Sequence, residues 1–297
     1  MCSQLPLTAI LLFVIPLSAQ QPLPQSTQEQ LAALARLQVL TQSEFMNLLS
    51  HAQSGDREAQ YLIALAYEGG STLNKDGAAS RSWMLKSAKQ GYVPAETGMG
   101  EAYLQTLSTE TGPIPDYGDA ERWLRLGATQ GSAEAQMWLG TGYERGYFGS
   151  TDYREALKWL RRSAEQGLPW AQFTLGQMYD GGEGVPESDS RAAYWYRKAA
   201  DHVTEAGGVW EAVVQLVYMY HDDRLPKDWV QAYMWSAIVD SCYSPPSDDN
   251  TDWAARHMSK AEIRHAQLMA RDWIRRHTPQ GDDQPRCDRD PLSYPKR

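Results

Sequence analysis

Four kinds of residue recur along this chain in one register, at steps of 36 or 40 residues. The tryptophan column is Trp83, Trp123, Trp159, Trp195 and Trp235, and the glycine column is Gly55, Gly91, Gly131 and Gly167. The alanine column is Ala59, Ala95, Ala135 and Ala171, and the tyrosine column is Tyr67, Tyr103, Tyr143 and Tyr179. Four columns in one register indicate copies of one unit between about residues 44 and 240. Periods of this length are typical of two-helix repeats.

The unit is clearest between residues 152 and 186. Its first half places Ala156, Trp159, Leu160, Ser163 and Ala164 at the spacing of one helix face. Gly167 then supplies a left-handed residue that ends a helix. The second half predicts another helix with Ala171, Leu175, Met178 and Tyr179 on one face. Gly176 lies within that face, where a missing side chain lets two helices approach closely. Such a helical hairpin needs neighbours to bury its apolar face.

Three segments carry a family resemblance: AEQGLPWAQFTLGQMYDGGEGV (164–185), GATQGSAEAQMWLGTGYERG (127–146) and AAYWYRKAA (192–200). They resemble Sel1-like repeats, which are relatives of the tetratricopeptide repeat, and the likeness extends over roughly residues 43 to 277. The resemblance implies an all-α fold, a right-handed α-solenoid of about five to six two-helix repeats with helical caps. It also implies a protein that binds other proteins, and it does not imply catalysis.

The repeat register predicts one solenoid domain over residues 29–277. Its repeats are 44–75 (without the tryptophan), 76–115, 116–151, 152–188 and 189–227, followed by a sixth first helix at 228–240. An amphipathic helix from Thr27 to Leu40 could cap the start, after a linker at 20–28. A long helix over 253–277 resembles the C-terminal helix of Sel1-like arrays. Its predicted apolar stripe is Ala261, Arg264, His265, Leu268, Met269 and Trp273. Residues 278–297 are polar and proline-rich, which favours a mobile tail.

Residues 1–19 carry no charged side chain and contain an apolar run from Leu5 to Leu17. This run is too short to span a bilayer and is followed by Ser18, Ala19 and a polar stretch. The pattern predicts a secretory signal peptide cleaved near Ala19, and therefore export, to the periplasm in a bacterium. A buried helix is the alternative. No membrane insertion is expected after cleavage.

Cleavage would leave two cysteines, Cys242 and Cys287. In an oxidising compartment an even number of cysteines favours a disulfide, which here would tie the tail to the end of the sixth first helix. On the chain-entropy model, closing a loop of this length stabilises by roughly 4 kcal/mol. A redox role is the alternative, but no Cys-x-x-Cys motif is present.

Charge and motifs argue against several classes of function. The formal net charge of −9 disfavours general affinity for nucleic acid or anionic membranes, because both need a basic surface. The six histidines are scattered, and the best cluster, His221-Asp222-Asp223, is more typical of a solvated turn than of a metal site. No nucleophile elbow, phosphate loop or dinucleotide motif occurs. We therefore expect no enzyme activity, no cofactor and no metal.

The first helix of each repeat has a face that the core does not use. Counting from each tryptophan, positions −3, 0, +1, +4 and +5 are apolar or small, which leaves −1, +2 and +3. These remaining positions hold Lys86, Arg122, Arg125, Lys158, Arg161, Arg162, Arg197 and Lys198. One interpretation is an ordinary solvated helix face. The other is a groove for an acidic segment of a partner protein, in which Arg125, Arg161 and Arg197 form a ladder.

Two tyrosines, Tyr194 and Tyr233, flank core tryptophans and are candidate partner contacts, since tyrosine is a common interface anchor. Exported relatives of this kind include envelope scaffolds and immunity proteins that neutralise toxic effectors. The resemblance therefore favours an immunity-type inhibitor, with a scaffold in envelope or exopolysaccharide assembly as the alternative. A β-lactamase-like hydrolase is a third interpretation, but the sequence offers no activated serine or zinc ligands for it.

Overall fold

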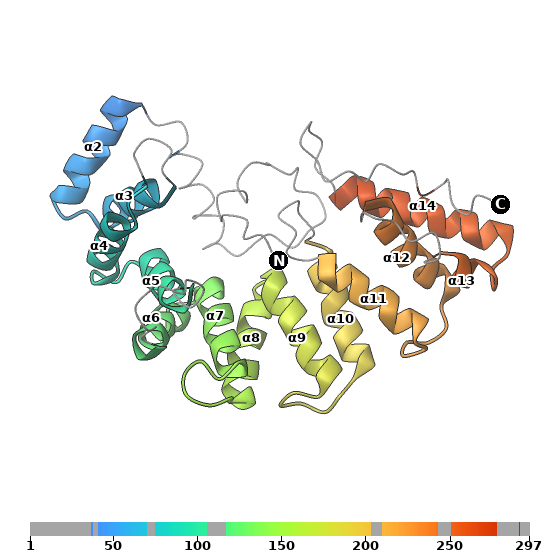
Figure 1. Ribbon diagram of the computed structural model, residues 1–297. Helices are drawn as coiled ribbons and strands as arrows, with labels where there is room; N and C mark the ends of the chain where they lie inside the picture. Colours follow the sequence, from blue (N-terminus) through green and yellow to red (C-terminus); the bar gives the residue numbers. More distant parts are fainter. Residues whose placement is uncertain are drawn as a thin grey trace. The chain divides into compact units, whose positions relative to one another are not determined.

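The computed structural model describes residues 37, 41–69, 75–105, 117–202, 210–242, 251–277 and 291. Within them the chain forms thirteen helices and no strand, so the all-α fold is confirmed (Figure 1). The helices are α2 (Gln42–Gln53), α3 (Arg57–Gly69), α4 (Gly77–Ala88), α5 (Val93–Gln105), α6 (Tyr117–Thr129), α7 (Ala133–Glu144), α8 (Tyr153–Glu165), α9 (Pro169–Gly181), α10 (Asp189–Ala200), α11 (Trp210–His221), α12 (Trp229–Cys242), α13 (Asp252–Ala255) and α14 (Lys260–His277). The predicted signal peptide, linker and mobile tail lie outside the described residues.

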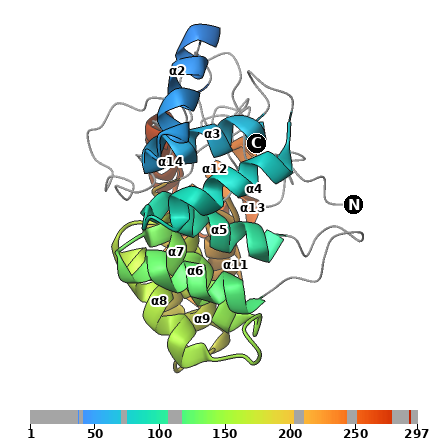
Figure 2. The same ribbon diagram turned by 90° about the vertical axis from the view of Figure 1, so that its left-hand side faces the viewer.

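The chain divides into two compact units, and the division falls in the first turn of α9, between Ala171 and Gln172. The first unit contains α2 to α8 and the second contains most of α9 together with α10 to α14. Within the first unit, α3 packs on α4, α5 on α6 and α7 on α8, as both views show (Figures 1 and 2). These pairs are in closer contact than those joined at the glycine column, such as α4 with α5.

The pairs α3–α4, α7–α8 and α9–α10 are each tied by one recurring backbone bond. The N–H of the residue before the second helix donates to the carbonyl of the tyrosine column, from Asp76 to Tyr67, from Asp152 to Tyr143 and from Ser188 to Tyr179, at 2.9–3.1 Å. Asp76 and Asp152 also cap the helices that follow, since their carboxylates accept from the first-turn N–H groups. The same residues therefore end one helix and start the next.

Glycines inside the helices set how closely the members of each pair approach. A Cβ at Gly140 would lie 2.6 Å from Cγ of Leu160, and one at Gly100 would lie 2.4 Å from Cγ of Leu124. In the second unit, a Cβ at Gly176 would lie 2.7 Å from the ring of Tyr196. Real Cβ atoms essentially never come so close, so the large residue on one helix requires glycine on the other. The close approach predicted for Gly176 is confirmed.

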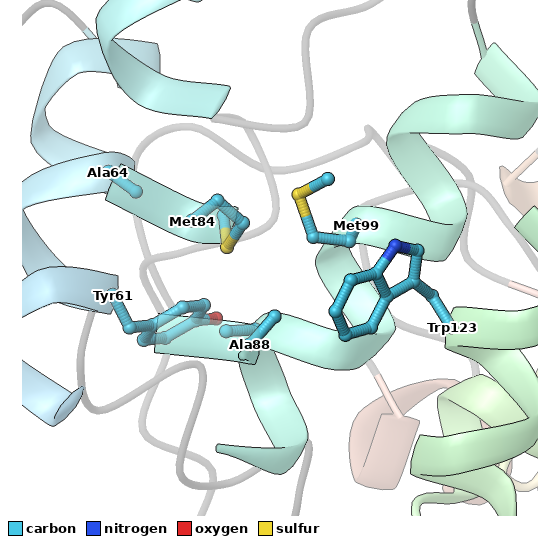
Figure 3. Packing of buried hydrophobic residues seen from close by; sticks show 7 residues of the cluster. Tyr61, Ala64, Met84, Ala88, Met99 and Trp123 are labelled. Carbon is cyan, nitrogen blue, oxygen red and sulfur yellow. The ribbon is translucent and has the colours of Figure 1, made fainter. Parts of the chain in front are cut away.

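The predicted core positions of α8 are also confirmed. The buried residues of α8 are Ala156, Trp159, Leu160, Ser163 and Ala164, the set that helical spacing predicts. Trp123, Trp159 and Trp235 are buried, whereas Trp83 and Trp195 are partly buried. Figure 3 shows one cluster of the first unit, in which Met84, Met99 and Trp123 lie close to the small residues Ala64 and Ala88. Its members come from α3, α4, α5 and α6, so successive pairs share one core.

Two further columns are polar, and the sequence analysis did not identify them. One contains Gln60, Glu96 and Gln136, which are buried, and the other contains Gln90, Gln130 and Gln166. The second column donates to the first, from Gln90 to Gln60 at 2.8 Å, from Gln130 to Glu96 at 2.6 Å and from Gln166 to Gln136 at 2.7 Å. Each amide is held in place because a misplaced one would leave a buried polar group unpaired. Their steps of 36 and 40 residues could have revealed them.

The C-terminal cap differs from the prediction in two respects. The predicted long helix is broken after α13, because Ser259 starts a new helix: its hydroxyl accepts from the Glu262 N–H while the Glu262 carboxylate accepts from the Ser259 N–H. The predicted stripe of α14 was also mostly wrong, because only Trp273 is buried and Met269 partly buried, whereas Ala261, Arg264, His265 and Leu268 are exposed. The buried residues are Ala266, Gln267, Ala270, Trp273 and His277.

Trp273 holds the cap in place. Its ring meets those of Trp210 and Trp235 edge to face, with centroids 6.2 and 5.8 Å away, and it stacks on His277 at 4.3 Å. Because α14 covers α12, the side chains of α12 are buried on nearly every side. No helix within the described part of the chain is long and apolar enough to cross a membrane.

Replacing Gly140 by alanine should lower the free energy of unfolding by about 1–3 kcal/mol, because the new methyl group forces Leu160 and its backbone to move. Gly77→Ala is the matched control, since nothing lies within 4 Å of a Cβ at that helical position. We expect the control to be neutral or slightly stabilising. Urea denaturation of both variants makes the comparison, and equal stability would contradict the close-approach argument.

Cys242 is disulfide-bonded in the structure. The chain has two other cysteines, Cys2 and Cys287, both outside the described residues, so the pairing with Cys287 stays a prediction. We expect Cys242 to resist maleimide unless a reductant is added, and Cys287→Ser to make it reactive. Mass spectrometry of the labelled protein reads this out. A Cys242 that stays protected in Cys287→Ser would exclude the predicted pair.

Candidate functional site

The exposed positions of α6 form a shallow depression on the first unit. It is lined by Gly118, Glu121, Arg122, Arg125, Leu126 and Thr129. Leu126 has 42 % of its surface exposed, and both arginines reach solvent. Arg122, Arg125 and Leu126 occupy the positions −1, +2 and +3 that the tryptophan register assigns to solvent. The depression therefore offers two guanidinium groups beside an exposed apolar side chain.

Both arginines of α6 already have acidic partners. Arg122 pairs with Asp119 at 3.0 Å, and its guanidinium lies 5.2 Å from the centre of the Trp123 ring. Arg125 donates to the Glu121 carboxylate and to the Tyr143 hydroxyl, and that hydroxyl donates to Glu121.

These bonds shift the ionisation of the two groups that share Glu121. The hydrogen bond to Glu121 raises the pKa of Arg125. Burial and the hydrogen bond to Glu121 raise the pKa of Tyr143. The network is thus a neutral phenol between an anion and a cation.

On α8 the cations lie around a buried tryptophan. Lys158 pairs with Glu155 at 2.9 Å and lies 5.0 Å from the centre of the Trp159 ring. Arg162 lies 4.9 Å from the same ring, and the Trp159 indole N–H donates to Glu155 at 3.0 Å. Arg161 is exposed beside them. Cation–π contacts of this kind hold the cations close to the helix surface.

In the second unit, the predicted residues of α10 have mixed positions. Tyr194 is 52 % exposed and touches Trp195 edge to face at 5.1 Å. Arg197 and Lys198 are partly buried, and Arg197 donates to the Tyr220 hydroxyl at 2.9 Å.

The predicted arginine ladder therefore has a structural role at two of its three positions. Arg125 and Arg197 each bond to a tyrosine hydroxyl of the following helix. Arg161 lies in the first unit with Arg125, whereas Arg197 lies in the second. Charge reversal of all three would consequently disturb the fold as well as any binding surface.

Tyr233 is not a surface residue, so its prediction as a partner contact is corrected. Its side chain is fully buried in α12, where the Gln267 amide lies 3.4 Å from its hydroxyl. The reason is that α14 covers the face of α12 that earlier repeats leave exposed.

The sequence analysis also missed the acids that neutralise the cations. Asp119, Glu121 and Glu155 stand three or four residues before Arg122, Arg125 and Lys158, and this spacing is the signal that could have found them. Within the described part of the chain, no group of three or more His, Cys, Asp or Glu is arranged to hold a metal ion.

The comparisons with known proteins identify the repeat. A family model described as the Sel1 repeat matches residues 57–92, 93–132, 133–168 and 171–202. The chain contains four Sel1 repeats. The first three matched segments each span one of the close helix pairs, α3–α4, α5–α6 and α7–α8. Each family repeat in this part of the chain therefore coincides with one closely packed helix pair. Sel1 repeats generally mediate contacts between proteins and are typically non-catalytic.

Solved Sel1 structures have a similar fold. A Sel1 repeat protein from Oxalobacter formigenes is 24 % identical, with a TM-score of 0.53 over 87 % of this chain and 96 % of that one. A protective antigen of uropathogenic Escherichia coli is 25 % identical, with a TM-score of 0.47 over 79 % of this chain and 56 % of that one. A Sel1 repeat protein from Klebsiella pneumoniae is 20 % identical, with a TM-score of 0.45 over 72 % of this chain and 96 % of that one. A comparison with curated proteins found no match.

An acidic cluster elsewhere in the first unit responds to pH. Burial, with the charges of Glu68 and Glu134, raises the pKa of Glu101 to about 7. The folded state therefore holds a proton that the unfolded state loses near its ordinary value of 4.5. The protonated Glu101 contributes its full stabilisation of the folded state at pH values below the unfolded pKa. This contribution is lost as the pH rises from there through about 7.

Glu101→Gln should therefore stabilise the protein at pH 8, on the order of 1–3 kcal/mol, and have little effect near pH 4.5. Glu165→Gln, which removes an exposed carboxylate of α8, serves as the control and should leave the stability unchanged at both pH values. Thermal unfolding at the two pH values measures the difference. A gain of equal size at both would rule out the raised pKa as its cause.

Proposed function

We propose that this chain is an exported, non-enzymatic protein that binds an acidic segment of a toxic effector protein and thereby neutralises it. The binding surface would be the α6–α8 face, defined as Arg122, Arg125, Leu126, Lys158, Arg161 and Arg162. The observation that carries the proposal is the exposure of five cations and a leucine on these two helices of one unit.

The charge balance of this face supports an acidic ligand. Asp119, Glu121 and Glu155 each pair with one of the five cations. Two further exposed cations, Arg161 and Arg162, lie on α8, in a chain whose net charge is −9. Arginine suits such a site because its planar fork accepts carboxylates in pairs.

Rigid support also favours binding at this surface. The Glu121–Arg125–Tyr143 network and the contacts around Trp159 fix the direction of several cations before a partner arrives. Little side-chain entropy is then lost on association. Leu126, next to Arg125, would supply an apolar contact that polar side chains surround.

The export and immunity parts of the proposal rest on other grounds. Export follows from the uncharged apolar start of the sequence, and neutralisation follows from the resemblance to exported Sel1-like proteins. A scaffold in envelope or exopolysaccharide assembly would use the same surface with a different partner.

The test is a pull-down from periplasmic extract with wild-type protein and with Arg161→Glu/Arg162→Glu. We expect the double reversal to weaken partner binding by roughly tenfold or more. Arg154→Glu/Lys89→Glu is the matched control, because it reverses two exposed cations of the same unit. Circular dichroism checks that each variant is folded.

The captured protein is then produced in the periplasm with and without this chain. Toxicity that wild-type protein relieves and the double reversal does not relieve supports immunity. A harmless partner, together with loss of envelope polymer on deletion, supports the scaffold. Equal capture by wild type and the Arg161/Arg162 variant would show that the partner does not bind at the α6–α8 face.

A further inference from the structure

The outer face of α14 carries a straight line of cations that no part of the proposed function uses. We call it the cap stripe, defined as Lys260, Arg264, Leu268, Arg271 and Arg275. All five are exposed, and Leu268 has 39 % of its surface in solvent. Steps of four, four, three and four residues place them along one side of the helix over about 22 Å.

Helix stability does not explain the cap stripe. Lys260 and Arg264 are like charges four residues apart, and so are Arg271 and Arg275. Such pairs destabilise a helix, and a cation in the first turn, as at Lys260, opposes the helix dipole. On α6 and α8, by contrast, each of Arg122, Arg125 and Lys158 has an acid one turn earlier. On the cap stripe, Arg275 alone has one.

The charges of the cap stripe are also poorly neutralised. Lys260, Arg264 and Arg271 make no ion pair with any residue in the described ranges, whereas Arg275 pairs with Asp272 at 2.6 Å. With Arg276, helix α14 has five basic residues against the two acids Glu262 and Asp272, a surplus of three positive charges. This surplus lies within a chain whose net charge is −9.

The helix that presents these charges is firmly held. Trp273 packs against Trp210 and Trp235, and Ser259 with Glu262 closes the first turn. The cap stripe residues make none of these contacts. They are therefore free to bind without disturbing the cap, and a change at them should leave the fold intact.

We propose that the cap stripe is a second docking surface, and that its partner is an acidic helical segment of another protein. A line of cations with a leucine at its middle complements a helix that carries acids one turn apart on both sides of an apolar residue.

The net charge of the chain selects a short protein segment over an extended polyanion. Charges separated by more than about 8 Å are largely screened at physiological ionic strength. A short segment on α14 thus interacts mainly with the local positive surplus, whereas a DNA duplex or a membrane would also meet the acidic remainder of the chain. Charge complementarity is therefore local to α14.

The experiment measures binding of a synthetic acidic helix of 18 residues, with glutamates one turn apart and a central leucine, to the full-length protein at low salt. The test variant is Lys260→Gln/Arg264→Gln/Arg271→Gln. The matched control is Arg81→Gln/Lys89→Gln/Arg154→Gln, which removes the same charge from exposed positions of the first unit. Phosphatidylglycerol vesicles and duplex DNA are the competing probes.

We expect the test variant to bind the peptide about tenfold more weakly than wild type, with the control unchanged and Leu268→Ala also weaker. A peptide of the same composition with the glutamates scrambled should bind less well. Equal losses in test and control variants, or no binding of the peptide by wild type, would overturn the proposal. So would binding of vesicles or DNA, but not of the peptide, that depends on the cap stripe.

Discussion

The close approach of two helices at a glycine is the constraint on which the rest of this structure depends. Leu124 and Leu160 each occupy the space that a side chain at Gly100 or Gly140 would need. This contact fixes which side of each first helix turns inward, and it therefore also fixes which side remains in solvent. The cations of α6 and α8 are exposed because Leu124 and Leu160, one residue after each tryptophan, are inserted into the neighbouring helix.

The polar columns perform a related task at the helix ends. The exposed Gln166 joins successive helices by bonding to the buried Gln136 amide, and Arg125 and Arg197 bond to tyrosines on the helices that follow. A repeat array needs such directional contacts because apolar packing alone would allow neighbouring helices to slide. Part of what resembles a binding ladder in the sequence is therefore a set of fixed bonds between repeats. The surplus charge available to a partner is smaller than a count of arginines suggests.

Sequence reasoning succeeded where one repeat predicts the next. The register identified the buried face of α8 and the role of Gly176, because each copy has an equivalent neighbour on both sides. It failed at the end of the array, where Tyr233 and the buried face of α14 depend on a helix without an equivalent. On α14, alanines lie on several sides, so spacing alone could not show that Leu268 faces outward. The intrahelical acids were missed because the register compares repeats and ignores neighbours one turn away.

The two proposed surfaces differ in how a partner would gain binding energy. At the α6–α8 face, a carboxylate must compete with Glu121 and Glu155, so an acidic ligand exchanges one ion pair for another and gains specificity more than affinity. On the cap stripe, Arg264 and Arg271 make no ion pair with a described residue, so a partner adds new attraction there. In the free protein, the like charges within α14 repel one another and destabilise the helix. An acidic partner relieves that repulsion when it binds. A neutral surface, or one whose charges are already paired, has no such repulsion to relieve.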